Sequence, residues 1–179
     1  MRPIKNFDKV QARGTFKRLE AGGYVIRIQS AKDCHTMGET ENSYLAIVYD
    51  IAEGPEAGRY KDEEPKNDFR HMVRNSYKDK ALASFKQFTE AVEASNAGYK
   101  WDWDEDTLTG KIVGVEFGYE EYEANDGNIK ERIYVNNFLP ADCIRSGDFK
   151  VPELKKLPQS SQSAIPAGFT QISDADVPF

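Results

Sequence analysis

Apolar and polar residues alternate along five stretches of the chain, and a sixth stretch has a helical period. Alternation at every second position predicts strands over residues 24–32, 44–51, 69–76, 111–119 and 129–137. A short extension around residues 59–61 is expected to pair with the third strand. Within residues 78–94, Leu82, Phe85, Phe88 and Val92 recur at three to four residues, which predicts an amphipathic helix.

Turn residues separate these segments. Ser-Asn-Ala-Gly at residues 95–98 is expected to end the helix, and Asn-Asp-Gly-Asn at residues 125–128 predicts a hairpin between the last two strands. The resulting order is strand, strand, strand, helix, strand, strand. It predicts a mainly β fold with one helix, namely an OB-like five-stranded barrel in which the helix follows the third strand. Other α+β folds can share this order.

The end of the chain differs in composition from the rest. No basic residue follows Lys156, and serine, glutamine and proline are frequent there. We therefore expect an OB-like domain over residues 1–156 and a disordered C-terminal tail over residues 157–179.

Charge and hydropathy restrict the class of protein. The 179 residues carry 24 basic and 30 acidic side chains, so the net charge is −6, and the acidity is concentrated in the second half. No apolar run approaches the roughly 20 residues of a membrane span, and charged residues interrupt the region where a signal peptide would need an apolar stretch. We expect a cytoplasmic protein without membrane contact. Cys34 and Cys143 lie in no CxxC pair and are expected to be reduced thiols.

Basic and aromatic side chains lie opposite the apolar positions of several predicted strands. This combination suits single-stranded DNA, because cations follow the phosphates and rings stack on bases. The predicted DNA-binding residues are Arg27, Tyr44, Arg59, Tyr60, Lys61, Arg70, Arg74, Lys130, Arg132 and Tyr134, with Tyr77, Lys100 and Trp101 as further candidates. The alternative is that these are ordinary solvated charges and rings that pack in the barrel.

The acidic residues also allow an enzyme hypothesis. A two-metal nuclease site would combine Asp102, Asp104 or Asp106 with Glu116, Glu120 or Glu121. An EF-hand loop opening at Asp102 is excluded, since Thr107 and Val113 replace its Gly and Glu. Asp104 or Asp106 is instead expected to cap a turn, with Trp101 or Trp103 covering the barrel end.

Cys34, His35, His71 and Cys143 match no zinc spacing, and nucleotide and nucleophile motifs are absent. We expect no catalysis, metal or cofactor.

The last six residues form a distinctive motif, Asp174-Ala175-Asp176-Val177-Pro178-Phe179. A terminal ring and carboxylate on a stiff end suit capture by a partner protein. This end resembles the acidic tip of bacterial and phage single-stranded DNA-binding proteins, which coat single strands with an OB fold and recruit replication, recombination and repair proteins with the tip. The resemblance implies a partner-binding role for Asp174, Asp176, Val177, Pro178 and Phe179. Ala175 interrupts the acidic run, which predicts weaker partner binding.

The body resembles a family of phage and prophage proteins from Gram-positive hosts, a domain of unknown function encoded among replication and recombination genes. The resemblance lies in YLAIVYDIAEGPEAGRY (44–60), SNAGYKWDWDEDTLTGKIVGVEFGYEEY (95–122) and GDFKVPELKKL (147–157). Together with the tip and the predicted basic face, it leads us to expect a phage protein in the host cytoplasm that coats single-stranded DNA during replication and recombination. A homo-oligomer is compatible with this assignment. The alternatives are a metal-dependent nuclease and a replication adaptor that does not touch DNA.

Overall fold

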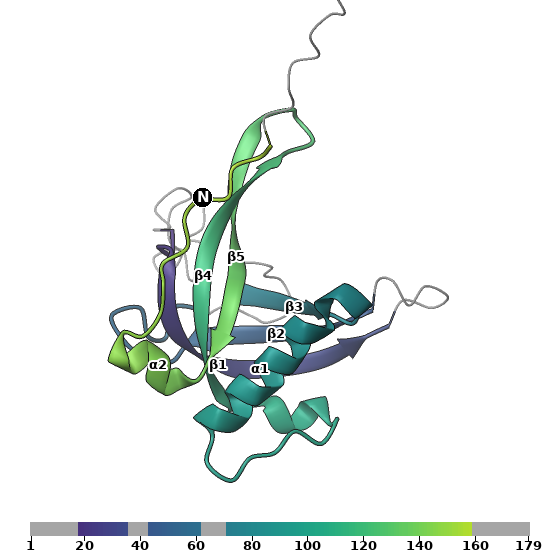
Figure 1. The fold of residues 1–179 in the computed structure, drawn as a ribbon, viewed down its shortest axis with the longest axis vertical. Coiled ribbons are helices and arrows are strands. Elements are labelled where there is room, and N and C mark those ends of the chain that lie inside the picture. Colours follow the sequence, from purple (N-terminus) through teal and green to yellow (C-terminus); the bar gives the residue numbers. More distant parts are fainter. Residues whose placement is uncertain (1–17, 36–42, 62–70, 159–179) are drawn as a thin grey trace, which may run out of the picture.

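The structure is a computed structural model that describes residues 18–35, 43–61 and 71–158. A five-stranded antiparallel sheet forms its centre, in the order β3-β2-β1-β4-β5. The strands are β1 (Gly22–Cys34), β2 (Tyr44–Ile51), β3 (Met72–Ser76), β4 (Ile112–Glu123) and β5 (Ile129–Leu139). The helices are α1 (Leu82–Ser95) and the short α2 (Ala141–Ser146), and the 3-10 turns are η4 (Asp79–Ala81) and η5 (Glu105–Leu108). Figure 1 shows α1 crossing in front of the sheet.

The predicted succession of three strands, a helix and two strands is confirmed. The helix ends at Ser95, where Asn96 adopts extended dihedral angles and donates its side-chain amide to the carbonyl of Val92 at 2.7 Å. Three details of the prediction were wrong. Within the described residues the third strand begins at Met72, residues 55–61 form turns rather than an extra strand, and α2 was missed.

The predicted closed barrel is also wrong, because the sheet is open. In the sheet order, β3 and β5 are the two edge strands and do not pair with each other. β3 has five residues and β5 has eleven, so β3 offers little length for pairing along β5. The fold is therefore a mainly β open sheet with one long helix.

The inner face of the sheet packs against α1. Phe85, Phe88, Ala91 and Val92 of the helix are buried there, which matches the helical period of the sequence. The Phe88 ring meets Phe138 of β5 edge-on, with centroids 5.0 Å apart. Burial of these apolar side chains is the main source of stability for this layer.

The β4–β5 hairpin extends beyond the other strands. Figure 1 shows it projecting from the body, with residues 147–158 running beside it. The backbone of Lys155 donates to the carbonyl of Tyr119 at 2.9 Å and accepts from the amide of Glu121 at 2.8 Å. β4 pairs with β1 only as far as Phe117, opposite Gly22. The segment around Lys155 therefore satisfies β4 backbone groups where β1 has ended.

Candidate nucleic-acid interface

The predicted basic positions of β5 share one face. Arg132 pairs with Glu120 and Tyr134 with Gly118 on β4, and residues directly opposite in a ladder point to the same side. Lys130, Arg132 and Tyr134 therefore project together, while Val135 pairs with the buried Phe117 on the other side.

Carboxylates of the hairpin pair with two cations of this face, and a third cation, Lys155, covers its ring. Arg132 Nε donates to Glu120 Oε1 at 2.7 Å, and Lys130 Nζ donates to Asp126 Oδ2 at 2.8 Å. The bond from Lys130 holds the pKa of the Asp126 carboxyl below its ordinary value. Lys155 Nζ lies 3.8 Å from the centre of the Tyr134 ring. A ligand phosphate would have to compete with these partners for the cations.

A second group of cations lies on the outer face of β1, β2 and β3. Lys32 of β1 and Arg74 of β3 both pair with Ala46 of β2, one on each side. Arg74 also has its guanidinium carbon 5.1 Å from the centre of the Tyr44 ring. We call Lys32, Tyr44, Ala46 and Arg74 the β2–β3 face. It places two cations and a ring around one small residue.

Lys32 is absent from the predicted DNA-binding residues because a β-bulge in β1 changes the face on which it lies. The pairing of β1 with β2 shifts register between Ile28 and Ser30, which inserts one extra residue and changes the face to which later side chains point. Simple alternation from the buried Ile26 and Ile28 would turn Lys32 inward. The bulge turns it outward, where the side chain is exposed.

A hollow lies between β3 and β5. Arg74 of the β2–β3 face and Arg132 of β5 both line it. Its volume is about 490 Å³, and Arg74, Asn75, Glu120, Arg132 and Tyr134 are among its lining residues. Asn75 is only 5% exposed, and its side-chain nitrogen has no hydrogen-bond partner. Buried amide groups are normally paired. We call this hollow the β3–β5 gap.

Two predicted contact residues belong to the core or to local structure instead. Tyr60 is 3% exposed, and its ring stacks on buried His71 with centroids 4.9 Å apart. The Arg59 side chain is largely buried and forms an ion pair with Glu56. A turn over residues 55–61 returns the chain to the sheet and carries both inward. Assigning Arg59 and Tyr60 to the DNA surface was therefore wrong, whereas Lys61 at the end of this turn is exposed.

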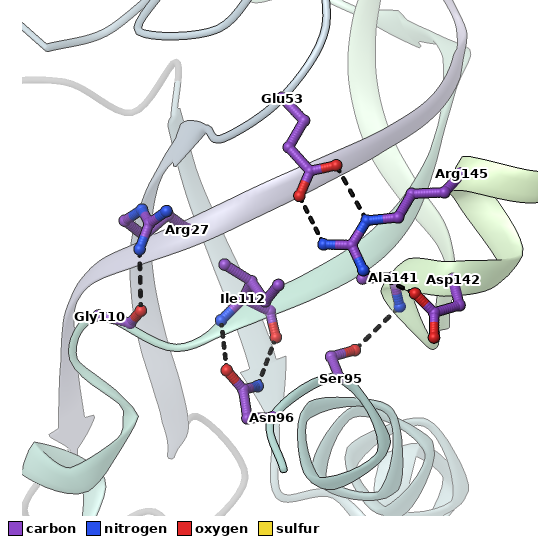
Figure 2. A network of polar contacts seen from close by, with 9 residues as sticks. All are labelled: Arg27, Glu53, Ser95, Asn96, Gly110, Ile112, Ala141, Asp142 and Arg145. Atoms are coloured by element: carbon purple, nitrogen blue, oxygen red, sulfur yellow. Dashed lines mark hydrogen bonds and ion pairs between the residues drawn. The ribbon is translucent and has the colours of Figure 1, made fainter.

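Arg27 is exposed, but it lies apart from the β2–β3 face. Its Nη1 donates to the carbonyl of Gly110 at 3.4 Å. Five residues separate it from Lys32, which is about 15 Å along a strand. Figure 2 shows Arg27 near the network in which Arg145 of α2 holds Glu53 through two hydrogen bonds of 2.6 and 3.0 Å.

The predictions for Arg70 and for the tip residues lie outside the described residues. The tip residues are Asp174, Asp176, Val177, Pro178 and Phe179.

The acidic residues of the nuclease hypothesis have local structural partners. Asp104 accepts a hydrogen bond from the Asp106 amide at 3.1 Å and caps η5, as predicted. Glu116 is buried and accepts from the side chains of Asn136 and Asn137, while Glu120 pairs with Arg132. Within residues 18–35, 43–61 and 71–158, no group of three or more His, Cys, Asp or Glu side chains lies close enough to hold a metal ion.

The remaining predicted candidates are spread over other parts of the molecule. Lys100 pairs with Glu93 at 2.7 Å, and Tyr77 and Trp101 line a separate aromatic pocket.

Cys34 and Cys143 are free thiols. Neither helix in the described ranges combines the length and apolar character needed to cross a bilayer.

Comparison with known proteins adds no family assignment. No protein-family model matches the chain, and no curated protein matches it significantly.

Proposed function

We propose that this protein binds single-stranded DNA through the β2–β3 face and the adjoining β3–β5 gap. The open sheet with the order β3-β2-β1-β4-β5, and with α1 between β3 and β4, is compatible with an OB-like fold. OB folds bind oligonucleotides on the face of strands two and three and with neighbouring loops. The candidate residues lie at the corresponding part of this sheet.

The observation that carries the proposal is the row formed by Lys32, Ala46 and Arg74, with Tyr44 beside it. Antiparallel pairing aligns the first three residues across three strands. The small alanine between two cations leaves room for a phosphate or a sugar, and the Tyr44 ring offers a stacking surface. A cationic groove with aromatic platforms is the usual design of sites that bind single strands without sequence preference.

The β3–β5 gap would extend this track. Arg132 and Tyr134 line the same hollow as Arg74. Arg132 must exchange Glu120 for a phosphate, so part of its contribution is lost. With Lys32, Arg74 and Arg132 as the phosphate contacts, the logarithm of affinity should fall with the logarithm of salt concentration with a slope of about −2.

The test is the affinity of the full chain for a labelled dT oligonucleotide of about 16 nucleotides, measured by fluorescence anisotropy at two salt concentrations. Lys32→Ala combined with Arg74→Ala should weaken binding and reduce the salt slope by about 1.4. Tyr44→Ala should cost about 1 to 3 kcal/mol of binding free energy.

Lys86→Ala is the matched control, because Lys86 is an exposed cation of α1 that pairs with Glu90. It should leave affinity unchanged. Equal losses in the control and in the double variant would refute the β2–β3 face as the site. Cleavage of the oligonucleotide in magnesium would favour the nuclease alternative, and no binding at either salt concentration would favour the adaptor.

A further inference from the structure

A second hollow lies between the end of β1, the start of α1 and the loop before η5. Its volume is about 300 Å³, near the lower end of the range for ligand pockets. Four rings and two carboxylates dominate its lining, from Tyr77, Phe85, Trp101, Trp103, Asp33 and Glu105. We call it the aromatic pocket. No basic side chain is among the described residues that line it.

Phe85 is in contact with each of the other three rings. Its centroid lies 5.6 Å from Tyr77, 6.5 Å from Trp101 and 6.5 Å from Trp103. Trp103 is nevertheless 80% exposed, and it has a positive φ of 68°. This backbone conformation is unfavourable for a residue with a side chain, and the exposed ring is accessible to a ligand. Both features fit a ring that is held in place for a ligand.

In the aromatic pocket the Asp33 carboxylate is occupied, since its Oδ2 pairs with His35 Nε2 at 2.5 Å. Glu105 and Trp101, in contrast, have atoms without a partner among the described residues. Tyr77 donates its hydroxyl to Asp33 Oδ1 at 2.9 Å, and the Asp33 amide donates to Glu105 Oε1 at 3.4 Å. Within the described part of the chain, Glu105 makes no hydrogen bond through its other carboxylate oxygen. The buried Nε1 of Trp101 also has no partner. The site therefore presents ring faces and an available carboxylate oxygen.

We propose that the aromatic pocket binds the arginine side chain of an exposed basic segment in a partner protein. A guanidinium group stacks on aromatic faces and donates to carboxylates in the same plane, and tryptophan provides the strongest cation–π attraction. Asp102, Asp104 and Asp106 add negative charge along the adjoining loop. This charge favours a cation and repels the phosphates of a nucleic acid.

This site is separate from the proposed DNA site. None of the six named residues belongs to the β2–β3 face or lines the β3–β5 gap. The proposed role also differs from that of the C-terminal tip. At the tip this chain would supply the inserted residues, whereas at the aromatic pocket the partner would supply the inserted side chain and this chain the pocket. Failure of one proposal therefore leaves the other unaffected.

The test uses the two tryptophan indole N–H signals in ¹H–¹⁵N NMR spectra of the full chain. The probe is the capped tripeptide acetyl-Gly-Arg-Gly-amide, and the comparison peptide carries citrulline, which has similar shape and no charge. Both indole signals should shift and saturate with the arginine peptide only. Trp103→Ala should weaken binding about five-fold or more, and Glu105→Gln should weaken it while leaving the backbone spectrum unchanged.

Glu90→Gln is the control, because Glu90 is an exposed carboxylate on the surface of α1. It should not alter the titration. Three results would overturn the proposal: no saturable shift of the indole signals, equal shifts with the citrulline peptide, or saturable shifts with a single-stranded oligonucleotide. The last result would identify a base-binding pocket. The exposure of Trp103 means that its substitution should leave the fold intact, and Trp103→Phe should retain part of the affinity.

Discussion

At the residue scale, the ion pair between Glu120 and Arg132 limits the positive charge that the β3–β5 gap offers. The Arg132 guanidinium lies 2.7 Å from the Glu120 carboxylate and also 5.3 Å from the centre of the Tyr122 ring. The Arg132 and Glu120 side chains both line the β3–β5 gap. The same arginine can therefore hold the hairpin together or bind a phosphate, and the carboxylate competes for it.

Glu120→Gln should strengthen DNA binding. The change keeps the shape and removes the negative charge, so Arg132 becomes available at the cost of an ion pair worth about 0.2 to 1 kcal/mol. Anisotropy titration with a dT oligonucleotide should show an increase of up to about five-fold at low salt. An unchanged affinity in both Glu120→Gln and Arg132→Ala would exclude Arg132 from the interface.

Individual residues show where sequence reasoning reaches its limit. The alternation of β5 was sufficient to place Lys130, Arg132 and Tyr134 on one face. It did not reveal their carboxylate partners, since ion pairs across a hairpin depend on register. Tyr60 was misassigned because a polar turn surrounds it in sequence, while the turn folds its ring against Tyr49 and His71.

At the scale of elements, α2 is held to the sheet by a few polar contacts. Figure 2 shows Arg145 between Glu53, in the turn after β2, and Asp142 of its own helix. The amide of Ala141 also donates to Ser95 Oγ at 2.9 Å, which ties the start of α2 to the end of α1. The paired Arg145 holds the pKa of the Glu53 carboxyl below its ordinary value.

Arg145→Ala should lower stability where the carboxylates that it pairs with, Glu53 and Asp142, are ionised. A carboxyl with a lowered folded-state pKa contributes stability above its unfolded pKa of about 4.3, and this contribution is lost as pH falls through the folded-state value. Because both side chains are partly exposed, solvent screens the pair, and the loss at neutral pH should be small.

Urea unfolding of wild type and variant at neutral and strongly acidic pH measures this effect. The difference between their unfolding free energies should shrink toward zero in acid. Lys86→Ala, which removes a more exposed pair, serves as the control and should show a smaller difference. A difference that persists unchanged in acid would mean that Arg145 acts by packing rather than by charge.

The order of strands and helix was predictable, because each element has a clear local pattern. Whether the sheet closes into a barrel was not predictable from such patterns. Alternation in β2 and the helical spacing in α1 follow directly from which side chains are buried. The bulges in β1 and in the β4–β5 pair, and the space between β3 and β5, arise from contacts between distant segments. α2 has six residues, too few for a periodic pattern.

At the scale of the whole molecule, a protein with a net charge of −6 must bind a polyanion through local charge. The β2–β3 face gathers Lys32 and Arg74 around Ala46. Elsewhere in the described residues, several cations pair with carboxylates. The sequence after Lys156 has no basic residue and ends in a motif with two aspartates. Such a segment is an anion that can compete with DNA for the same face.

Deleting residues 158–179 should therefore strengthen DNA binding at low salt. The expected gain is about two-fold or more and should disappear at high salt, where exposed charges are screened. Anisotropy titration of the full chain and the truncated chain with one oligonucleotide measures it. Replacing Asp174 and Asp176 by Asn in the full chain should reproduce most of the gain. Weaker binding after truncation would show that these residues assist the interaction.

The proposed DNA site is tested most sharply by mapping where a single strand binds on the protein. Tryptophan emission is unsuitable, because Trp101 and Trp103 both line the aromatic pocket. Backbone ¹H–¹⁵N NMR shifts should be recorded while a dT oligonucleotide is added to the full chain. If DNA binds at the proposed site, the largest shifts should fall on Lys32, Tyr44, Ala46 and Arg74 and continue to Arg132 and Tyr134. Shifts confined to α1, α2 or the aromatic pocket, or no shifts at all, would contradict it.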